Sequence, residues 1–214
     1  MARQSVEKEK VMATQTAKSN VSSADYFSVF GLPRKLWIEM SALEQKFLGL
    51  SWKLHPDNFV NATEEEQELS LKRSSELNDA YRTLKDPVAR VEYLLAIEGE
   101  RKEGEKKQQA PPELLEEVFE LNESLDELRE AKSAGTDVAA LKARLQAAEG
   151  SFGEKLAEVD AQMQVTAKDW DTALDKGADV AARKRIMARL NEHLNRRSYI
   201  RNLVLNVRKE LEEA

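Results

Sequence analysis

Apolar residues recur at every third or fourth position along most of this 214-residue chain, which is the spacing of α-helices. The longest such stripe, with steps of i, i+4, i+7, i+11 and i+14, consists of Leu114, Val118, Leu121, Leu125 and Leu128. Glycine and proline, which interrupt helices, number only 8 and 5. No stretch shows the alternation of apolar and polar residues that is typical of a strand. The sequence therefore predicts an all-α protein.

The composition limits the classes of function that are open to the chain. A formal net charge of −6 argues against a general nucleic-acid-binding protein. Because cysteine is absent, the chain has no thiol nucleophile and cannot hold an iron–sulfur cluster through thiolates. No apolar run approaches the ~20 residues that cross a bilayer. We expect a bacterial cytoplasmic protein with no membrane partner. The mitochondrial matrix is the weaker alternative, because a presequence is poor in acids and residues 7 and 9 are glutamates.

Changes in composition divide the chain into four segments. Residues 1–24 are polar and lack a helical period, which predicts a disordered tail. Residues 98–111 are rich in Glu, Lys and Gln, which predicts a solvated linker. The remaining segments, residues 25–97 and 112–214, carry the apolar stripes. We therefore expect two helical domains, of which the second is a bundle.

The first domain is predicted to contain two long helices joined by a loop. Ser41 and Glu44 have the Ser-x-x-Glu spacing of a capping box, which marks a helix start. Thr63 and Glu66 repeat this spacing. The first helix must end at His55, because the proline that follows crowds the backbone of the residue before it. The second helix stops at the next Asp-Pro pair, so a short loop would make the two helices an antiparallel hairpin.

The first of these helices has a core face and a basic face. Lys46 and Lys53 lie off its apolar stripe. The stripe consists of Leu43, Phe47, Leu50 and Leu54. A further short helix is expected at residues 88–97, with its inward side formed by Val91, Leu94 and Leu95.

Three helices are expected in the second domain. The first carries the long leucine stripe and is broken at residues 133–136. The second runs from Asp137 to about Thr166, with Gly150 and Gly153 as weak points. The third spans residues 179–212. Because the first helix is rich in Glu and the third in Arg, their charges suit neighbours in one three-helix bundle.

The most informative motif is His55-Pro56-Asp57, which stands in the loop between the two capped helices. A catalytic use of His55 and Asp57 would need a nucleophile or metal and a pocket, and the sequence supplies none of these. A plain helix end would explain the proline, but not the pattern downstream of it, namely Ala80-Tyr81, Leu84, Asp86-Pro87 and Arg90. In physical terms, a rigid turn can present the Asp57 carboxylate to a partner's cation at a low ordering cost.

This combination of tripeptide, flanking helices and downstream pattern resembles a J-domain. Among J-domain proteins the chain resembles the HscB family, and the likeness extends from Asp25 to about Lys132. Asn58 departs from the lysine that is common after the tripeptide. The segments that carry the likeness to HscB are Asp25-Tyr26-Phe27, Phe30-Gly31-Leu32-Pro33, His55-Pro56-Asp57-Asn58-Phe59 and Arg90-Val91-Glu92-Tyr93-Leu94-Leu95.

The resemblance implies a co-chaperone with no enzymatic activity and no cofactor of its own. It implies that His55, Pro56 and Asp57, together with Lys46 and Lys53, dock on a 70-kilodalton heat-shock chaperone of the HscA or DnaK type and favour its ATP hydrolysis. It also implies that the bundle binds an IscU-like iron–sulfur scaffold protein during cluster assembly. The alternative is a J-domain adaptor for a different client, in which the bundle serves for tethering or dimerisation.

Helical phase singles out Leu115 and Phe119, which lie roughly 100–140° from the centre of the long leucine stripe. They are apolar residues on the wrong face, rimmed by glutamates, so either a partner binds them or another helix covers them. The HscB resemblance implies partner binding. Glu116 departs from an apolar position of the family. The matching scaffold-contact positions are Leu115, Phe119, Glu120, Glu123, Glu127 and, on the last helix, Tyr199.

Other conspicuous residues receive structural interpretations. His193 has no second His or Cys at metal-binding spacing, so we interpret it as a partnered histidine at the edge of the core. Packing is the expected role of Trp37, Trp52 and Trp170. The basic run at residues 196–201 lacks a motif for reading nucleic acid, so it is expected to be a salt-bridged helix face.

Overall fold

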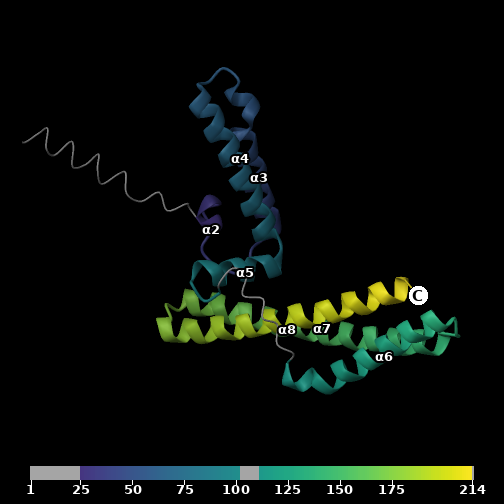
Figure 1. Ribbon diagram of the computed structural model, residues 1–214. Helices are drawn as coiled ribbons and strands as arrows, with labels where there is room; N and C mark the ends of the chain where they lie inside the picture. The colour runs from purple at the N-terminus through teal and green to yellow at the C-terminus, as the bar shows by residue number, and fades with distance from the viewer. Residues whose placement is uncertain (1–24, 102–110, 214) are drawn as a thin grey trace, which may run out of the picture. The chain divides into compact units, whose positions relative to one another are not determined.

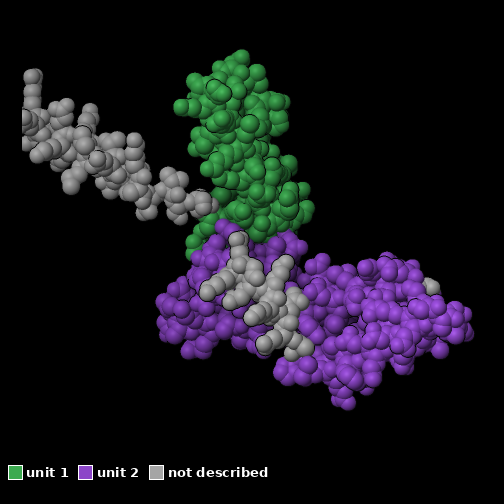
Figure 2. Space-filling model, in the orientation of Figure 1, with its two compact units in different colours: residues 1–34, 40–85 green, residues 35–39, 86–214 purple. Residues whose placement is uncertain are grey.

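The computed structural model describes residues 25–101 and 111–213, and every regular element within them is a helix (Figure 1). The all-α prediction is thereby confirmed. The predicted tail at residues 1–24 and most of the predicted linker lie outside the described residues. The chain forms two compact units, residues 1–34 with 40–85 and residues 35–39 with 86–214 (Figure 2). This division differs from the expected boundary at residue 97, and the expected domain limits stay a prediction.

The first unit consists of a short helix, α2 (Tyr26–Val29), and two long ones, α3 (Met40–Leu54) and α4 (Glu64–Lys85). The loop between α3 and α4 contains a 3-10 turn, η1 (Pro56–Phe59). The buried residues of this unit come from all three α-helices and from the residue that follows α2. They are Phe27, Phe30, Leu43, Ser70, Leu77, Ala80 and Leu84.

Two contacts show that α3 and α4 run antiparallel, as predicted. The rings of Phe47 and Tyr81 stack with their centroids 4.1 Å apart. Nearer the loop, Ser70 Oγ donates a hydrogen bond to Leu54 O at 3.1 Å. The number of residues between the two partners of a contact therefore decreases toward the loop. This is the pairing of a hairpin.

The two predicted capping boxes had different outcomes. At the start of α4, Thr63 N donates to Glu66 Oε2 at 3.0 Å and Glu66 N donates to Thr63 Oγ1 at 3.3 Å, which confirms the second box. The start predicted for α3 was wrong, because the helix begins at Met40 and Ser41 is already its second residue. The predicted end was correct, since α3 ends at Leu54 and His55 is extended.

The second unit contains α5 (Pro87–Ile97), η2 (Pro112–Leu114), α6 (Leu115–Ala134), α7 (Ala139–Asp175) and α8 (Val180–Glu212). Its last three helices form the predicted bundle (Figure 1). The long leucine stripe is buried as predicted, except that Val118 is only partly covered. The core cluster of the bundle consists of Leu114, Leu121, Leu125, Leu128, Leu145, Phe152, Val159, Ile200, Val204 and Val207.

The predicted end of α7 was wrong. The helix continues past Thr166 to Asp175 and runs through Gly150 and Gly153 without a break. Its second half carries a buried stripe at i, i+4, i+7, i+11 and i+14. These residues are Val159, Met163, Thr166, Trp170 and Ala173. The threonine in the middle of the stripe donates its hydroxyl to Gln162 O, so the helix buries a polar residue without leaving it unsatisfied.

Residues 35–39 belong to the second unit because two buried or half-buried side chains hold their backbone. Arg90 of α5, which is 4% exposed, donates to Leu36 O. The carboxylate of Asp171 on α7 accepts hydrogen bonds from Leu36 N at 2.7 Å and Trp37 N at 2.8 Å. Burial raises the pKa of the Asp171 carboxyl, although these two backbone donors oppose that shift.

The three tryptophans do not share one role. Trp170 is 1% exposed, so the expectation that it packs in the core is confirmed. The same expectation was wrong for Trp37 and Trp52, which are 68% and 79% exposed. Trp37 lies before α3, where no helical period applies, and Trp52 lies on α3 but off its predicted apolar stripe.

The basic run of α8 is salt-bridged, as predicted. Arg197 Nε lies 2.5 Å from Asp160 Oδ1 of α7. Arg196 Nη1 lies 3.3 Å from Glu113 Oε1, just before α6. The cations of α8 thus pair with α7 and with the η2 turn, whereas the sequence indicated a charge match with the first bundle helix alone.

His193 is partly buried and partnered, as predicted. Its Nε2 lies 3.2 Å from Thr166 Oγ1. Burial lowers the pKa of this imidazole below its usual 6.5, and Arg189 and Arg196 lower it further, whereas Glu192 acts in the opposite direction. A neutral ring is therefore favoured in the folded state.

This shift predicts a loss of stability in mild acid. The pKa of His193 is lower in the folded state than in the unfolded state. The contribution of His193 to the free energy of unfolding is therefore present above about pH 6.5 and is lost as the pH falls through the pKa of the folded state. We expect the free energy of unfolding, measured by urea denaturation, to decrease between pH 7.5 and pH 5.5. The decrease should be smaller in His193→Gln, and an identical pH dependence of the variant would contradict the assignment.

Candidate functional site

The loop after α3 is fixed by its own side chains. His55 Nδ1 accepts a hydrogen bond from Asp57 N at 3.3 Å, which caps the η1 turn. Asn58 Nδ2 donates to Trp52 O at 2.6 Å and so satisfies one of the carbonyls that the end of α3 leaves open. Asn58, which departs from the family's usual lysine, therefore has a structural role here. These bonds tie the tripeptide to the last turn of α3.

The other end of the loop is held by α4. Gln67 Nε2 donates to Val60 O and to Ala62 O, both at 3.2 Å. Ser70 Oγ donates to Leu54 O, so α4 also holds the end of α3. The loop backbone is therefore anchored on both sides before any partner arrives. A partner that bound it would pay little ordering entropy.

The Asp57 carboxylate projects into solvent, with its side chain 84% exposed. Asp57 Oδ2 lies 3.4 Å from His55 Nδ1. The same ring nitrogen accepts the Asp57 backbone N–H, so His55 orients this turn. The loop thus offers an anion that an external cation can reach.

The two predicted lysines differ in their availability. Lys46 Nζ donates to Phe30 O at 2.8 Å, so its ammonium group holds the end of α2. Lys53 is exposed in the last turn of α3, beside the loop. Both lysines are exposed and keep their charge, but Lys46 is also ordered by this bond to the backbone.

This difference predicts unequal effects on stability. We expect Lys46→Ala to lower the free energy of unfolding by about 1 kcal/mol, the usual net contribution of one hydrogen bond. Lys53→Ala, at an exposed position, should change it by no more than ~0.5 kcal/mol. Urea denaturation of the two variants tests this, and equal stabilities would show that the bond to Phe30 does not persist in solution.

The second predicted site lies on the outer face of α6. Leu115 and Phe119 are 55% and 65% exposed, and no described helix covers them. The alternative interpretation, in which another helix of the bundle packs on this pair, is therefore wrong for the described part of the chain. Glu120 and Glu123 are also exposed, one step further round the helix.

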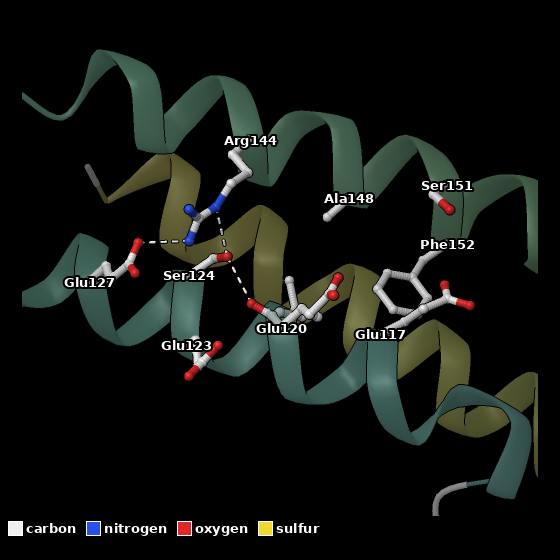
Figure 3. Close-up of a pocket in the computed structure, with 10 residues that line it drawn as sticks. Glu117, Glu120, Glu123, Ser124, Glu127, Arg144, Ala148, Ser151 and Phe152 are labelled. Carbon is white, nitrogen blue, oxygen red and sulfur yellow. Dashed lines mark hydrogen bonds and ion pairs between the residues drawn. The ribbon is translucent and has the colours of Figure 1, made fainter.

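Beside this face, α6 and α7 enclose a hollow with a carboxylate rim (Figure 3). Arg144 of α7 donates to Glu127 Oε2 at 2.6 Å and to Ser124 Oγ at 2.9 Å. On the same rim, Lys155 Nζ lies 3.0 Å from Glu117 Oε1. Two of the four rim carboxylates thus have cations from α7. The other two, Glu120 and Glu123, are exposed.

Arg144 was not predictable from the sequence because its contact with Glu127 spans two helices, and helical phase within one helix does not predict such a contact. Tyr199 of α8 is partly buried against the core cluster of the bundle. Packing therefore accounts for part of its side chain, and its role in client binding stays a prediction.

The described residues offer neither a cluster of metal ligands nor a helix that could cross a membrane. No group of three or more His, Cys, Asp and Glu side chains among them is arranged to hold a metal ion. None of the described helices combines the length and apolar character that crossing a membrane demands.

Comparison with known proteins identifies the family. The chain is 33% identical over 152 residues to the co-chaperone protein HscB homolog of Vibrio vulnificus, which covers 71% of this chain and 86% of that protein. The chain belongs to the HscB family of co-chaperones. The HscB homolog of Vibrio parahaemolyticus is 38% identical over 104 residues, which are 49% of this chain and 61% of that protein. No protein-family model matches the chain.

Solved structures of HscB share the fold. Chaperone HscB from Vibrio cholerae has a TM-score of 0.54 and 28% identity, over 88% of this chain and 98% of that one. Human co-chaperone HscB has a TM-score of 0.57 at 23% identity, over 89% and 84% of the two chains, and at that identity it supports the fold alone. A J-domain followed by a helical bundle is therefore the layout of this HscB protein.

Proposed function

We propose that this HscB protein stimulates the ATPase of an HscA- or DnaK-like 70-kilodalton heat-shock chaperone and delivers an IscU-like iron–sulfur scaffold protein to it. The observation that carries the proposal is the exposed Asp57 carboxylate in a loop that hydrogen bonds fix at both ends. A preorganised carboxylate can engage a guanidinium or ammonium group of the ATPase with little ordering cost. The protein acts on its partner's reaction and catalyses none itself.

The client-binding half of the proposal rests on the outer face of α6. Leu115 and Phe119 form an exposed apolar pair beside the exposed carboxylates of Glu120 and Glu123. An apolar centre with a polar rim is the usual anatomy of a protein interface. The proposed partner therefore presents an apolar side chain next to a cation.

Steady-state ATP hydrolysis by purified HscA- and DnaK-type chaperones, with and without this chain and an IscU-type scaffold, tests both halves. We expect the chain to raise the rate of one chaperone and the scaffold to raise it further. Stimulation that the scaffold leaves unchanged would favour a different client. A rate that the chain does not alter in either chaperone would overturn the proposal.

A further inference from the structure

Ser124 gives the side of α6 that faces α7 a buried hydroxyl group. The residue is 6% exposed, although serine is usually found on the surface. Its Oγ donates to Glu120 O at 2.8 Å, which uses the only proton of the hydroxyl. The oxygen can therefore only accept from α7, and it accepts from Arg144 Nε at 2.9 Å. Ser124 thus fixes the position of one guanidinium group.

The guanidinium group that Ser124 positions is bonded to a second residue of α6. Arg144 Nη2 donates to Glu127 Oε2 at 2.6 Å (Figure 3). Two bonds to two side chains fix both the place and the plane of an arginine head group. The side chains of Arg144 and Glu127 are 53% and 52% exposed, and ion pairs with that exposure add little to stability. The main effect of the pair is therefore on the charge that α6 presents, rather than on the fold.

The bonded guanidinium group acts on one carboxylate of the face that we propose for the client. Glu127 turns toward α7, whereas Glu123 points away from it (Figure 3). Glu120 lines the hollow together with Ala148 and Ser151 of α7, whose short neutral side chains bring no cation. Among the described residues, a cation of α7 thus compensates Glu127 but not Glu120 or Glu123.

A cation of the client would meet a competitor at the Glu127 end of this face. To reach the Glu127 carboxylate, it must displace the guanidinium group of Arg144, and the two like charges repel each other as it approaches. A client whose cation lies beside Glu120 or Glu123 avoids this competition. Discrimination between partners often depends on such a repulsive element. Arg144 therefore lowers the affinity for a cation and limits where that cation can bind.

We propose that Arg144 is a specificity-determining residue of the client site on α6, which holds Glu127 and excludes the client's cation from it. The inference rests on the proposed function, and it adds the place where the cation binds, beside Glu120 and Glu123. Removal of the guanidinium group should therefore strengthen client binding. A residue that only supported the bundle would have the opposite effect.

Calorimetric titration of the full chain with an IscU-type scaffold tests the sign of the effect. We expect Arg144→Gln to lower the dissociation constant about threefold or more, as the loss of one competing exposed ion pair would. The gain should shrink as the salt concentration rises, because exposed charges are screened.

Arg208→Gln is the matched control for the change in net charge. Arg208 is 56% exposed and lies 2.7 Å from Glu149 of α7, and neither residue lines the hollow. The substitution removes the same charge from the same bundle. The dissociation constant of this control should stay within about twofold of the parent value.

A double-mutant cycle shows whether Arg144 acts through Glu127. Glu127→Gln should raise the dissociation constant about threefold more in the Arg144→Gln background than in the parent, because only there is the carboxylate open to the client. Ser124→Ala frees the guanidinium group without changing the charge of the chain. It should give part of the gain of Arg144→Gln, and it serves the same test if that variant fails to fold.

Two results would overturn the inference and leave the proposed client site standing, provided that Leu115→Ala with Phe119→Ala weakens binding in the same assay. One is a dissociation constant of Arg144→Gln that equals or exceeds the parent value. The other is an equal effect of Glu127→Gln in the two backgrounds. If the apolar double variant binds like the parent, the client-binding half of the proposed function fails, and the inference fails with it.

Discussion

Replacing Asp57 with asparagine is expected to abolish ATPase stimulation and to leave the fold almost unchanged. Asparagine keeps the shape of the side chain and removes its charge, so a cation on the ATPase loses its partner. The side chain is 84% exposed and makes no contact that the fold needs, so stability should change by no more than ~0.5 kcal/mol. The steady-state hydrolysis rate at saturating chain concentration measures the effect.

A matched control separates this charge from the general acidity of the first unit. Glu65→Gln removes an exposed carboxylate from the first turn of α4 and should stimulate normally. His55→Gln should reduce stimulation, because the imidazole Nδ1 accepts the Asp57 N–H and orients the turn. Normal stimulation by Asp57→Asn would show that the loop does not dock as proposed.

The sequence predicted the helices best where the residues at helical spacing are all apolar and form the buried face. The four leucines of the stripe that begins at Leu114 are buried as expected, since apolar residues at helical spacing indicate the core face of a helix. The end of α7 was missed because Thr166 interrupts an apolar stripe that resumes at Trp170. A polar residue in a core position breaks the sequence signal but not the helix, because its hydroxyl bonds to the preceding turn.

The positions of the candidate site residues were predictable, but their hydrogen-bond partners were not. Helical phase placed Leu115 and Phe119 on the outer face of α6, and the structure leaves both exposed. It could not show that Lys46 is bonded to Phe30 O, or that Glu127 is bonded to Arg144. Such pairs join elements whose relative placement depends on the whole fold. One sequence period does not contain that information.

The assignment of residues 35–39 to the second unit was not predictable for the same reason, because it depends on contacts between distant parts of the sequence. Nothing local to residues 35–39 indicates that their backbone binds Arg90 and Asp171, which lie far away in the sequence. Arg90 belongs to the pattern that resembles a J-domain, but that pattern does not show which group its side chain binds. Both side chains bind backbone groups of residues 35–39, and a sequence does not show which backbone groups will be bonded.

The double substitution Leu115→Ala with Phe119→Ala is expected to weaken scaffold binding by at least ~2 kcal/mol, or about 30-fold, while basal stimulation without scaffold is retained. The pair is the only large apolar surface of α6 among its described residues, so its removal takes away the centre of the proposed interface and leaves the rim. Because both side chains are more than half exposed, the bundle should keep its stability.

Calorimetric titration of the chain with an IscU-type scaffold measures the loss. The matched control is Val165→Ala with Leu205→Ala, since these residues are 57% and 48% exposed on the other two helices of the bundle. The control should bind the scaffold with parent affinity. Unchanged affinity in the folded Leu115 and Phe119 variant would exclude this face of α6 as the client site. A large decrease in the melting temperature would instead show that the two side chains are buried in solution, because truncation of core side chains is what lowers stability by several kcal/mol.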